Sequence, residues 1–128
     1  MLKRKNEIAT LASKIENKEI KDKNIVKVKT KFEINQGIFS NAIDFFRITN
    51  DTSNENIYHH IGIYAFTFEA LLRYVNLKRT NLEISRNLEQ MRALENKMKI
   101  SVGYINSFPL SVDTKEDIEK IRLLMKEK

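Results

Sequence analysis

The chain has 128 residues, 41% of them hydrophobic and 31% charged, and a formal net charge of +6. This composition is typical of one folded domain over residues 1–128 and excludes a long disordered chain. Cysteine is absent, which excludes disulfides and thiolate metal sites, and no apolar run approaches the roughly 18 residues of a membrane span. We therefore expect a cytoplasmic protein with no membrane part.

The first half of the chain predicts strands joined by turns. Residues 9–15 (ATLASKI) and 24–30 (NIVKVKT) are apolar or alternating and indicate strands. Residues 32–42 predict a hairpin in which Asn35-Gln36-Gly37 forms the turn and Ile38-Phe39 restarts a strand. Residues 43–57 end in a polar cluster that predicts an exposed loop.

The second half alternates strands with helices. Residues 60–66 predict a strand with Ile61, Ile63 and Ala65 on one side, and residues 67–77 predict a short helix. Apolar steps of four, three, three and four over residues 82–98 predict one amphipathic helix. A strand is expected over 99–105, and a last helix is expected over 112–128, with Thr114 as a candidate cap.

Strands interleaved with helices predict an α/β fold. An open sheet of this kind is covered by helices on both faces. The sequence supplies about three helices for five or six strands, so we expect a domain that lacks part of its sheet.

The positive charge raises the alternative of a basic nucleic-acid-binding module. Lysines are frequent in the first quarter of the chain, but acidic residues interrupt them and only Phe32 lies nearby to stack on a base. Lys27, Lys29 and Lys31 alternate with Val26, Val28 and Thr30, a pattern typical of the solvent-facing side of a strand. We therefore favour a solvated surface and expect no nucleic-acid partner.

Five polar residues are candidates for chemistry. His60 and Tyr64 are four positions apart on one strand, so their side chains share a face, while Glu89 and Gln90 interrupt the apolar pattern of a helix and Asp113 precedes another. Each has a structural alternative: a satisfied histidine, solvated helix residues and a helix-start aspartate. Metal binding by the adjacent pair His59 and His60 is disfavoured, because neighbouring strand residues point to opposite faces. We expect His59 to face solvent.

Three stretches give these residues a common context. HHIGIYAF, LEISRNLEQMR and VDTKED occur in this order, after ATLASKI, NIVKVK and IFSNA. This arrangement resembles the carboxyl-terminal half of the 3-deoxy-manno-octulosonate cytidylyltransferases, the CMP-Kdo synthetases. The resemblance covers nearly the whole chain.

The resemblance implies a fold, a reaction and a site. The fold would be the carboxyl-terminal part of a Rossmann-like, GT-A-like nucleotide-diphospho-sugar transferase with a mixed sheet. The reaction would join Kdo, an eight-carbon sugar acid of lipopolysaccharide, to CTP and release pyrophosphate. By this resemblance His60, Tyr64, Glu89 and Gln90 hold the sugar acid, and Asp113 binds Mg²⁺.

The chain also departs from the family pattern. Asn41 stands where the family usually has arginine, and Arg86 stands where it commonly has glutamate. The resemblance implies roughly another hundred residues that hold the nucleotide, and these are not in this sequence. We therefore expect a fragment that needs a separately encoded amino-terminal half; the alternatives are an inactive remnant of a split gene and the basic binding module. Whether the chain forms a homodimer stays open.

Overall fold

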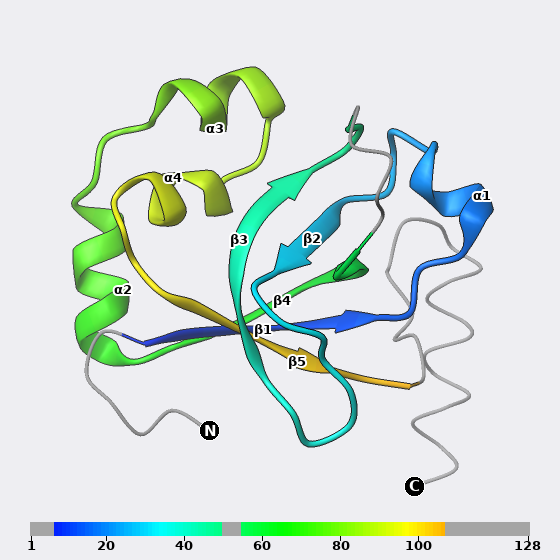
Figure 1. Cartoon of the computed structure of the whole chain (residues 1–128). Helices are drawn as coiled ribbons and strands as arrows, with labels where there is room; N and C mark the ends of the chain where they lie inside the picture. Colours follow the sequence, from blue (N-terminus) through cyan, green and yellow to red (C-terminus); the bar gives the residue numbers. More distant parts are fainter. Residues whose placement is uncertain (1–6, 50–54, 107–128) are drawn as a thin grey trace, which may run out of the picture.

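The structure, a computed structural model, describes residues 7–49 and 55–106. The predicted last helix over 112–128, with Thr114, lies outside the described residues. Five strands and four helices are present in the described part (Figure 1). The strands are β1 (Ile8–Ser13), β2 (Lys27–Thr30), β3 (Ser40–Phe46), β4 (Ile57–Phe66) and β5 (Ile100–Tyr104). The helices are α1 (Asn17–Ile20), α2 (Phe68–Val75), α3 (Asn81–Arg86) and α4 (Gln90–Glu95).

The five strands form a closed barrel in the order β1-β4-β2-β3-β5. Strands β1 and β5 run parallel, and the other neighbouring pairs are antiparallel. The prediction of a mixed α/β fold is therefore confirmed. Closure leaves none of the five described strands as an edge, so this sheet does not need helices on both faces.

The barrel interior is filled by apolar side chains of alternate strand positions. Ala12, Val28, Phe45 and Val102 are each 0% exposed, although they come from four different strands. Complete burial of a side chain as large as Val28 or Phe45 stabilises the fold by about 1.5–3 kcal/mol. The barrel therefore accounts for most of the core.

A two-residue bulge in β4 shapes the wall that carries the histidines. Thr10 pairs with Tyr64, but its neighbour Leu11 pairs with Ile61, so Gly62 and Ile63 have no partners in β1. An insertion of two residues preserves the alternation of faces, so His60 and Tyr64 still share one face. Ile63 lies in the insertion and is 54% exposed, while Ile61, which pairs with Leu11, is buried.

Two predictions in the first half need correction. The turn at residues 35–37 is confirmed, because the Ile38 N–H donates to the Asn35 carbonyl and Gly37 has a φ of 85°. The strand after it begins at Ser40 instead of Ile38, and it continues to Phe46 through a segment predicted as loop. The polarity of residues 49–56 hid this strand, because β3 carries a one-residue bulge that interrupts the regular alternation of its faces.

The predicted helix over 82–98 is two helices. Asn87 separates them in the left-handed conformation, with a φ of 54°, and the Leu88 N–H donates to the carbonyl of Glu83. Asparagine tolerates this conformation better than other side chains do. Helices α3 and α4 follow α2, and we call residues 68–95 the helical lobe; Figure 1 shows it at one end of the barrel.

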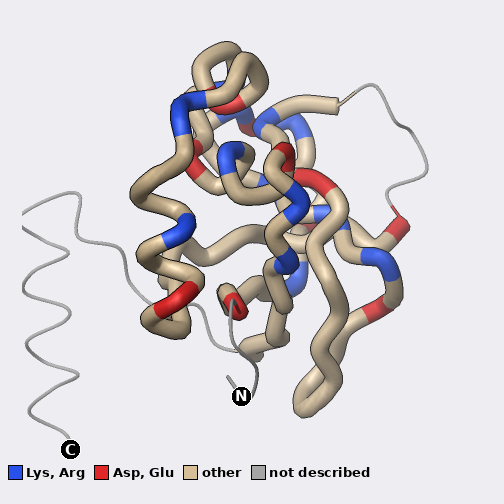
Figure 2. The backbone as a smooth tube through the Cα atoms, turned by 90° about the vertical axis from the view of Figure 1, so that its left-hand side faces the viewer, with Lys and Arg blue, Asp and Glu red and all other residues tan. Residues whose placement is uncertain are grey.

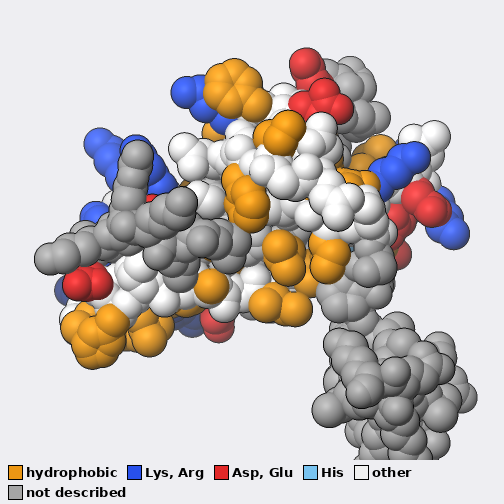
Figure 3. All heavy atoms as spheres, turned by 90° about the horizontal axis from the view of Figure 1, so that it is seen from below, with side chains coloured by type: hydrophobic (Ala, Val, Ile, Leu, Met, Phe, Trp, Pro, Cys, Tyr) orange, Lys and Arg blue, Asp and Glu red, His pale blue; other side chains and the backbone are white. Residues whose placement is uncertain are grey.

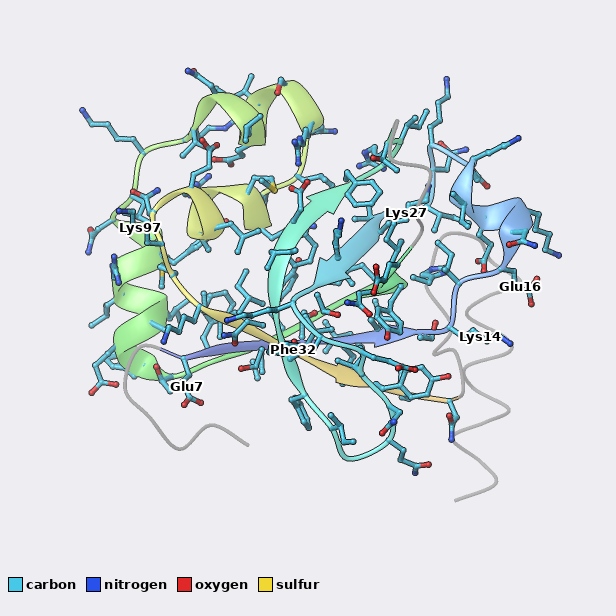
Figure 4. The ribbon with its side chains drawn as sticks, in the orientation of Figure 1. Glu7, Lys14, Glu16, Lys27, Phe32 and Lys97 are labelled. Carbon is cyan, nitrogen blue, oxygen red and sulfur yellow. The ribbon has the colours of Figure 1, made fainter. Side chains whose placement is uncertain are left out.

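Lys27 was predicted to face solvent, but the structure shows it buried. Its side chain is 0% exposed, and its ammonium group donates to the carbonyls of Asp22 and Arg47. Figure 4 labels it beside β2. Burial lowers its pKa, with Arg47 adding to the effect and the acidic Asp22 opposing it. Sequence alternation places side chains on two faces but does not show that a closed barrel and the α1 connection cover both of them.

The remaining surface is mixed. Phe32, Ile38, Phe68 and Leu72 are among the exposed apolar side chains, and Figure 3 shows hydrophobic side chains as separate patches interrupted by polar atoms. No helix within residues 7–49 or 55–106 is long and apolar enough to cross a membrane.

Candidate functional site

A cleft of about 990 Å³ opens between the barrel and the helical lobe. Its walls are strand β4, the segment that leads into β2, helix α2 and the connection from α3 to α4. Four of the five candidate residues, His60, Tyr64, Glu89 and Gln90, line it. Asp113, the predicted magnesium ligand, lies outside the described residues.

His60 is fixed by contacts on both sides of its ring. The ring lies 4.9 Å from the Phe45 ring, edge to face, and 5.5 Å from the Tyr64 ring. Its Nε2 lies 2.9 Å from the hydroxyl of Thr10, which also lies 2.8 Å from the carbonyl of Ile63. The single Thr10 hydroxyl proton goes to that carbonyl, which can only accept, so His60 Nε2 donates to Thr10. Nδ1 is then the nitrogen of the ring that can accept a hydrogen bond.

Burial sets the protonation states on the barrel wall. Burial lowers the pKa of His60 to about 4, and the nearby His59 adds to this effect. Burial also raises the pKa of Tyr64 above its usual range, and Tyr74 and Glu89 contribute. At neutral pH the barrel wall therefore presents an uncharged imidazole and a protonated phenol.

Glu89 and Gln90 reach the cleft because α3 and α4 are separate helices. The phenol of Tyr74 donates to the carbonyl of Glu89 at 3.0 Å. Arg92 lies over the Tyr74 ring, with its guanidinium carbon 4.9 Å from the ring centroid. Burial raises the pKa of Tyr74, so its phenol stays a donor.

The break between α3 and α4 is stabilised by one buried carboxylate. Glu83 has 1% of its side chain exposed and accepts two bonds from Arg92, at 2.9 and 2.6 Å. It also accepts from the Thr80 N–H in a capping box. The bonds from Arg92 hold the pKa of Glu83 at about 2, although burial alone would raise it.

The site has four contributors that were not predicted from the sequence: Thr10, Tyr74, Glu83 and Arg92. Glu83 and Arg92 lie within LEISRNLEQMR, so the signal was present in a stretch already singled out. A continuous helix would put residues nine apart on opposite faces and about 13 Å apart along the axis. The predicted unbroken helix therefore concealed the pair.

The expectation that His59 faces solvent is wrong. Its Nδ1 lies 2.8 Å from a carboxylate oxygen of Glu19, and only 14% of its side chain is exposed. Burial raises the pKa of Glu19, but hydrogen bonds from the Glu16 backbone and His59 outweigh this and lower it. Helix α1, which the sequence analysis did not predict, carries this carboxylate.

The basic residues do not form a nucleic-acid face on the side that Figure 2 shows, where acidic and basic residues are interspersed. Within residues 7–49 and 55–106, no Lys or Arg lines the cleft. No group of three or more His, Asp or Glu side chains in the same residues could hold a metal ion. Asn41, one of the departures from the family pattern, does not line the cleft.

Comparisons with known proteins assign the chain to an enzyme family. A family model described as cytidylyltransferase matches residues 1–100. Because that match covers most of the chain, the chain belongs to the cytidylyltransferase family.

The individual relatives are more specific. A 3-deoxy-manno-octulosonate cytidylyltransferase of Bartonella tribocorum is 43% identical over 123 residues, which cover 93% of this chain and 49% of the relative. The enzyme of the same name from Parvibaculum lavamentivorans is 41% identical over 117 residues, covering 91% and 45%. The chain thus spans about half the length of the curated relatives it matches.

A solved structure supports the same relationship. The structure of CMP:2-keto-3-deoxy-manno-octonic acid synthetase complexed with CTP matches with a TM-score of 0.75 and 27% identity, covering 94% of this chain and 49% of that one. The predicted family is thereby confirmed.

Proposed function

We propose that this chain takes part in the activation of Kdo with CTP, giving CMP-Kdo and pyrophosphate, and that its cleft holds the sugar acid. The observation that carries the proposal is the convergence of His60, Tyr64, Glu89 and Gln90 on one cleft from segments about 25 residues apart. The identity to Kdo cytidylyltransferases supports the choice of sugar. We also propose the GT-A-like form of the family fold.

The donor set suits a polyhydroxylated ligand. Tyr64 supplies a donor, Glu89 an acceptor, Gln90 both, and His60 Nδ1 an acceptor, so sugar hydroxyls that both donate and accept would find partners. A triphosphate carries several negative charges and is normally held by Lys or Arg. Since neither lines the cleft among the described residues, we assign it to the sugar.

The role of these residues is to bind and orient. In the proposed reaction the anomeric hydroxyl of Kdo attacks the α-phosphorus of CTP, a new P–O bond forms, and the bond to pyrophosphate breaks. Holding the sugar so that this hydroxyl faces the nucleotide reduces the entropic part of the barrier. We assign no proton transfer to a residue of this chain.

Magnesium is a separate prediction. The described residues contain no group that fits a metal ion, so we derive no step through it. Asp113 stays the predicted ligand, with CTP phosphates expected to supply further oxygens.

A binding experiment tests the sugar site first. The chain is titrated with Kdo while its amide resonances are recorded, for the wild type and for Gln90→Leu. Loss of the amide leaves a sugar hydroxyl unpaired, so we expect affinity to fall about tenfold. Gln36→Leu is the matched control, because Gln36 lies outside the cleft and its side-chain oxygen accepts a hydrogen bond from Asn106. Equal affinity for wild type and Gln90→Leu would contradict the proposed site.

A second experiment tests the reaction. Because the chain spans about half the length of its relatives, pyrophosphate release from CTP and Kdo is measured with the chain alone and with the unmatched half of the Bartonella tribocorum enzyme added. We expect release only from the mixture. The absence of CMP-Kdo in both samples, despite Kdo binding, would reject the reaction and keep the sugar site.

A further inference from the structure

The proposed sugar site is assembled from two parts of the fold that do not share a strand. His60 and Tyr64 lie on β4, whereas Glu89 and Gln90 lie between α3 and α4. A ligand that bonds to both parts needs a fixed spacing between them. The bond from Tyr74 to Glu89 ties the second part to α2, but it makes no link to the barrel.

Arg86, the last residue of α3, crosses from the lobe to the barrel. One of its terminal nitrogens, Nη1, donates to a carboxylate oxygen of Asp44 at 2.6 Å and to the carbonyl of Phe45 at 2.7 Å. The same nitrogen lies 3.9 Å from the sulfur of Met91, just after Gln90. Arg86 therefore touches β3 on one side and α4 on the other.

The residue that Arg86 holds is itself part of the cleft wall. Phe45 is 0% exposed, and its ring packs edge-on against the His60 ring at 4.9 Å. A continuous set of contacts thus runs from Met91, the residue after Gln90, through Arg86 and Phe45 to His60. Arg47 reinforces it, since its guanidinium lies 3.5 Å from the Arg86 carbonyl and 3.4 Å from the Asn87 carbonyl.

The small contribution of the Arg86–Asp44 ion pair to stability argues against a purely stabilising role. The side chains of Arg86 and Asp44 are 31% and 37% exposed, and pairs with this much solvent contribute about 0–1 kcal/mol to stability. A small energetic contribution combined with two short, directed bonds is what a positioning contact requires.

We propose that Arg86 is a positioning residue that sets the distance between the two halves of the sugar site. The choice of Kdo as the ligand rests on the proposed function, whereas the contacts of Arg86 are observed in the structure. Arg86 acts through Glu89 and Gln90 and does not line the cleft itself.

The test compares Arg86→Met, Arg86→Lys and Arg73→Met in the full chain. Arg73 is a matched control because it also donates to a carbonyl, that of Asn96, and does not line the cleft. Two readouts are taken: Kdo affinity by titration, and hydrogen exchange of the Leu88 and Met91 amides. These amides bond to the carbonyls of Glu83 and Leu88 and report the Asn87–Gln90 connection directly.

We expect Arg86→Met to weaken Kdo binding about tenfold and to raise exchange at both amides several-fold. Arg86→Lys should recover part of both effects, and Arg73→Met should show neither. Kdo affinity in Arg86→Met within about twofold of the wild type would overturn the proposal. If Arg86→Met does not fold, Asp44→Asn removes the same ion pair from the strand side, and unchanged affinity there would overturn it equally.

The exchange readout separates this inference from the proposed function. Should the wild-type chain not bind Kdo, the proposed function fails, and exchange alone decides about Arg86. Faster exchange at Leu88 and Met91 in Arg86→Met would then support the positioning role, and unchanged exchange would reject it.

Discussion

The two walls of the cleft are stabilised in different ways. The barrel wall belongs to a sheet in which each of the five strands is paired on both sides, over side chains such as Val28 and Phe45 that are 0% exposed. In the helical lobe, α2 buries only Ala70 and α3 buries only Glu83, while Leu88, Met91 and Ala93 are the buried apolar residues of the α3–α4 part. One wall therefore depends on backbone ladders and extensive apolar burial, and the other depends on fewer buried apolar side chains together with side-chain bonds.

This difference predicts where the site is rigid and where it is adjustable. Ladder hydrogen bonds and apolar burial are spread over many residues, so no single polar contact controls the positions of His60 and Tyr64. The positions of Glu89 and Gln90 depend on Arg92, Tyr74 and Arg86. Regions with few buried apolar contacts open at lower free energy than the core, so we expect the lobe to open before the barrel.

Within the helical lobe, the largest loss of stability should come from Arg92→Met. The substitution leaves the carboxylate of Glu83 buried without its bidentate partner, and breaking such a pair reduces the free energy of unfolding by about 3 kcal/mol. The pKa of Glu83, held at about 2 by Arg92, should rise, so the stability that it contributes above pH 4.5 in the wild type is lost in the variant. Urea denaturation measures the total loss, and exchange of the Leu88 amide measures the local part.

Two further variants show whether this effect is local to the lobe. Glu83→Gln combined with Arg92→Met removes the buried charge that has lost its bidentate partner and should recover part of the lost stability. Phe45→Ala is the counterpart in the barrel, where the cavity should reduce stability by about 4 kcal/mol and accelerate exchange throughout the sheet. Equal acceleration across the barrel in Arg92→Met would remove the proposed distinction between the walls.

A pH effect of intermediate size should come from His60 on the rigid wall. Its pKa is about 4 in the folded chain and about 6.5 when unfolded. Between these values the unfolded chain binds more protons, so the free energy of unfolding falls as the pH falls from 6.5 to 4 and is fully retained above 6.5. The loss is on the order of 2 kcal/mol over this window.

The matched variant is His60→Gln, which keeps a polar side chain but cannot titrate. We expect the stability difference between wild type and variant to shrink as the pH falls from 7 to 4.5, when both are measured by urea denaturation. A difference that is constant with pH would mean that burial does not keep His60 neutral, and the barrel wall would then be more open than its contacts indicate.

The sequence predicted local elements better than it predicted how they close around the site. Apolar alternation located β1, β2, β4 and β5 to within a few residues, and the turn at Gly37 was predicted because a positive φ favours glycine. The face shared by His60 and Tyr64 was predictable because a two-residue bulge preserves alternation. These predictions depend on near neighbours in the chain.

What could not be predicted depends on contacts between distant residues. The burial of Lys27 requires the carbonyl of Arg47, twenty residues away, and the polar contact of His59 requires Glu19, forty residues away. The break at Asn87 also runs against a regular apolar pattern. The bonds between the buried carboxylate of Glu83 and Arg92, nine residues later, outweigh the preference of the apolar pattern for one continuous helix. No local pattern in the sequence shows that this pair will form.

The smallest effect should come from the turns that end α3 and α4. Lys97 follows α4 with a φ of 61°, and the Met98 N–H donates to the carbonyl of Ala93, an arrangement in which glycine is preferred. Figure 4 labels Lys97 on the segment that connects α4 to β5, on the side of the helical lobe. Lys97→Gly should therefore raise the free energy of unfolding by about 0.5–1 kcal/mol.

Lys99→Gly is the control, because Lys99 is also exposed but lacks a positive φ, and it should lower stability slightly. Asn87→Gly should have a smaller effect than Lys97→Gly, since asparagine already tolerates the left-handed conformation. Thermal denaturation compares the three. If Lys97→Gly destabilises the chain as Lys99→Gly does, the turn after α4 is held by contacts of the lysine side chain, and the lobe is less dependent on Arg92 and Arg86 than we infer.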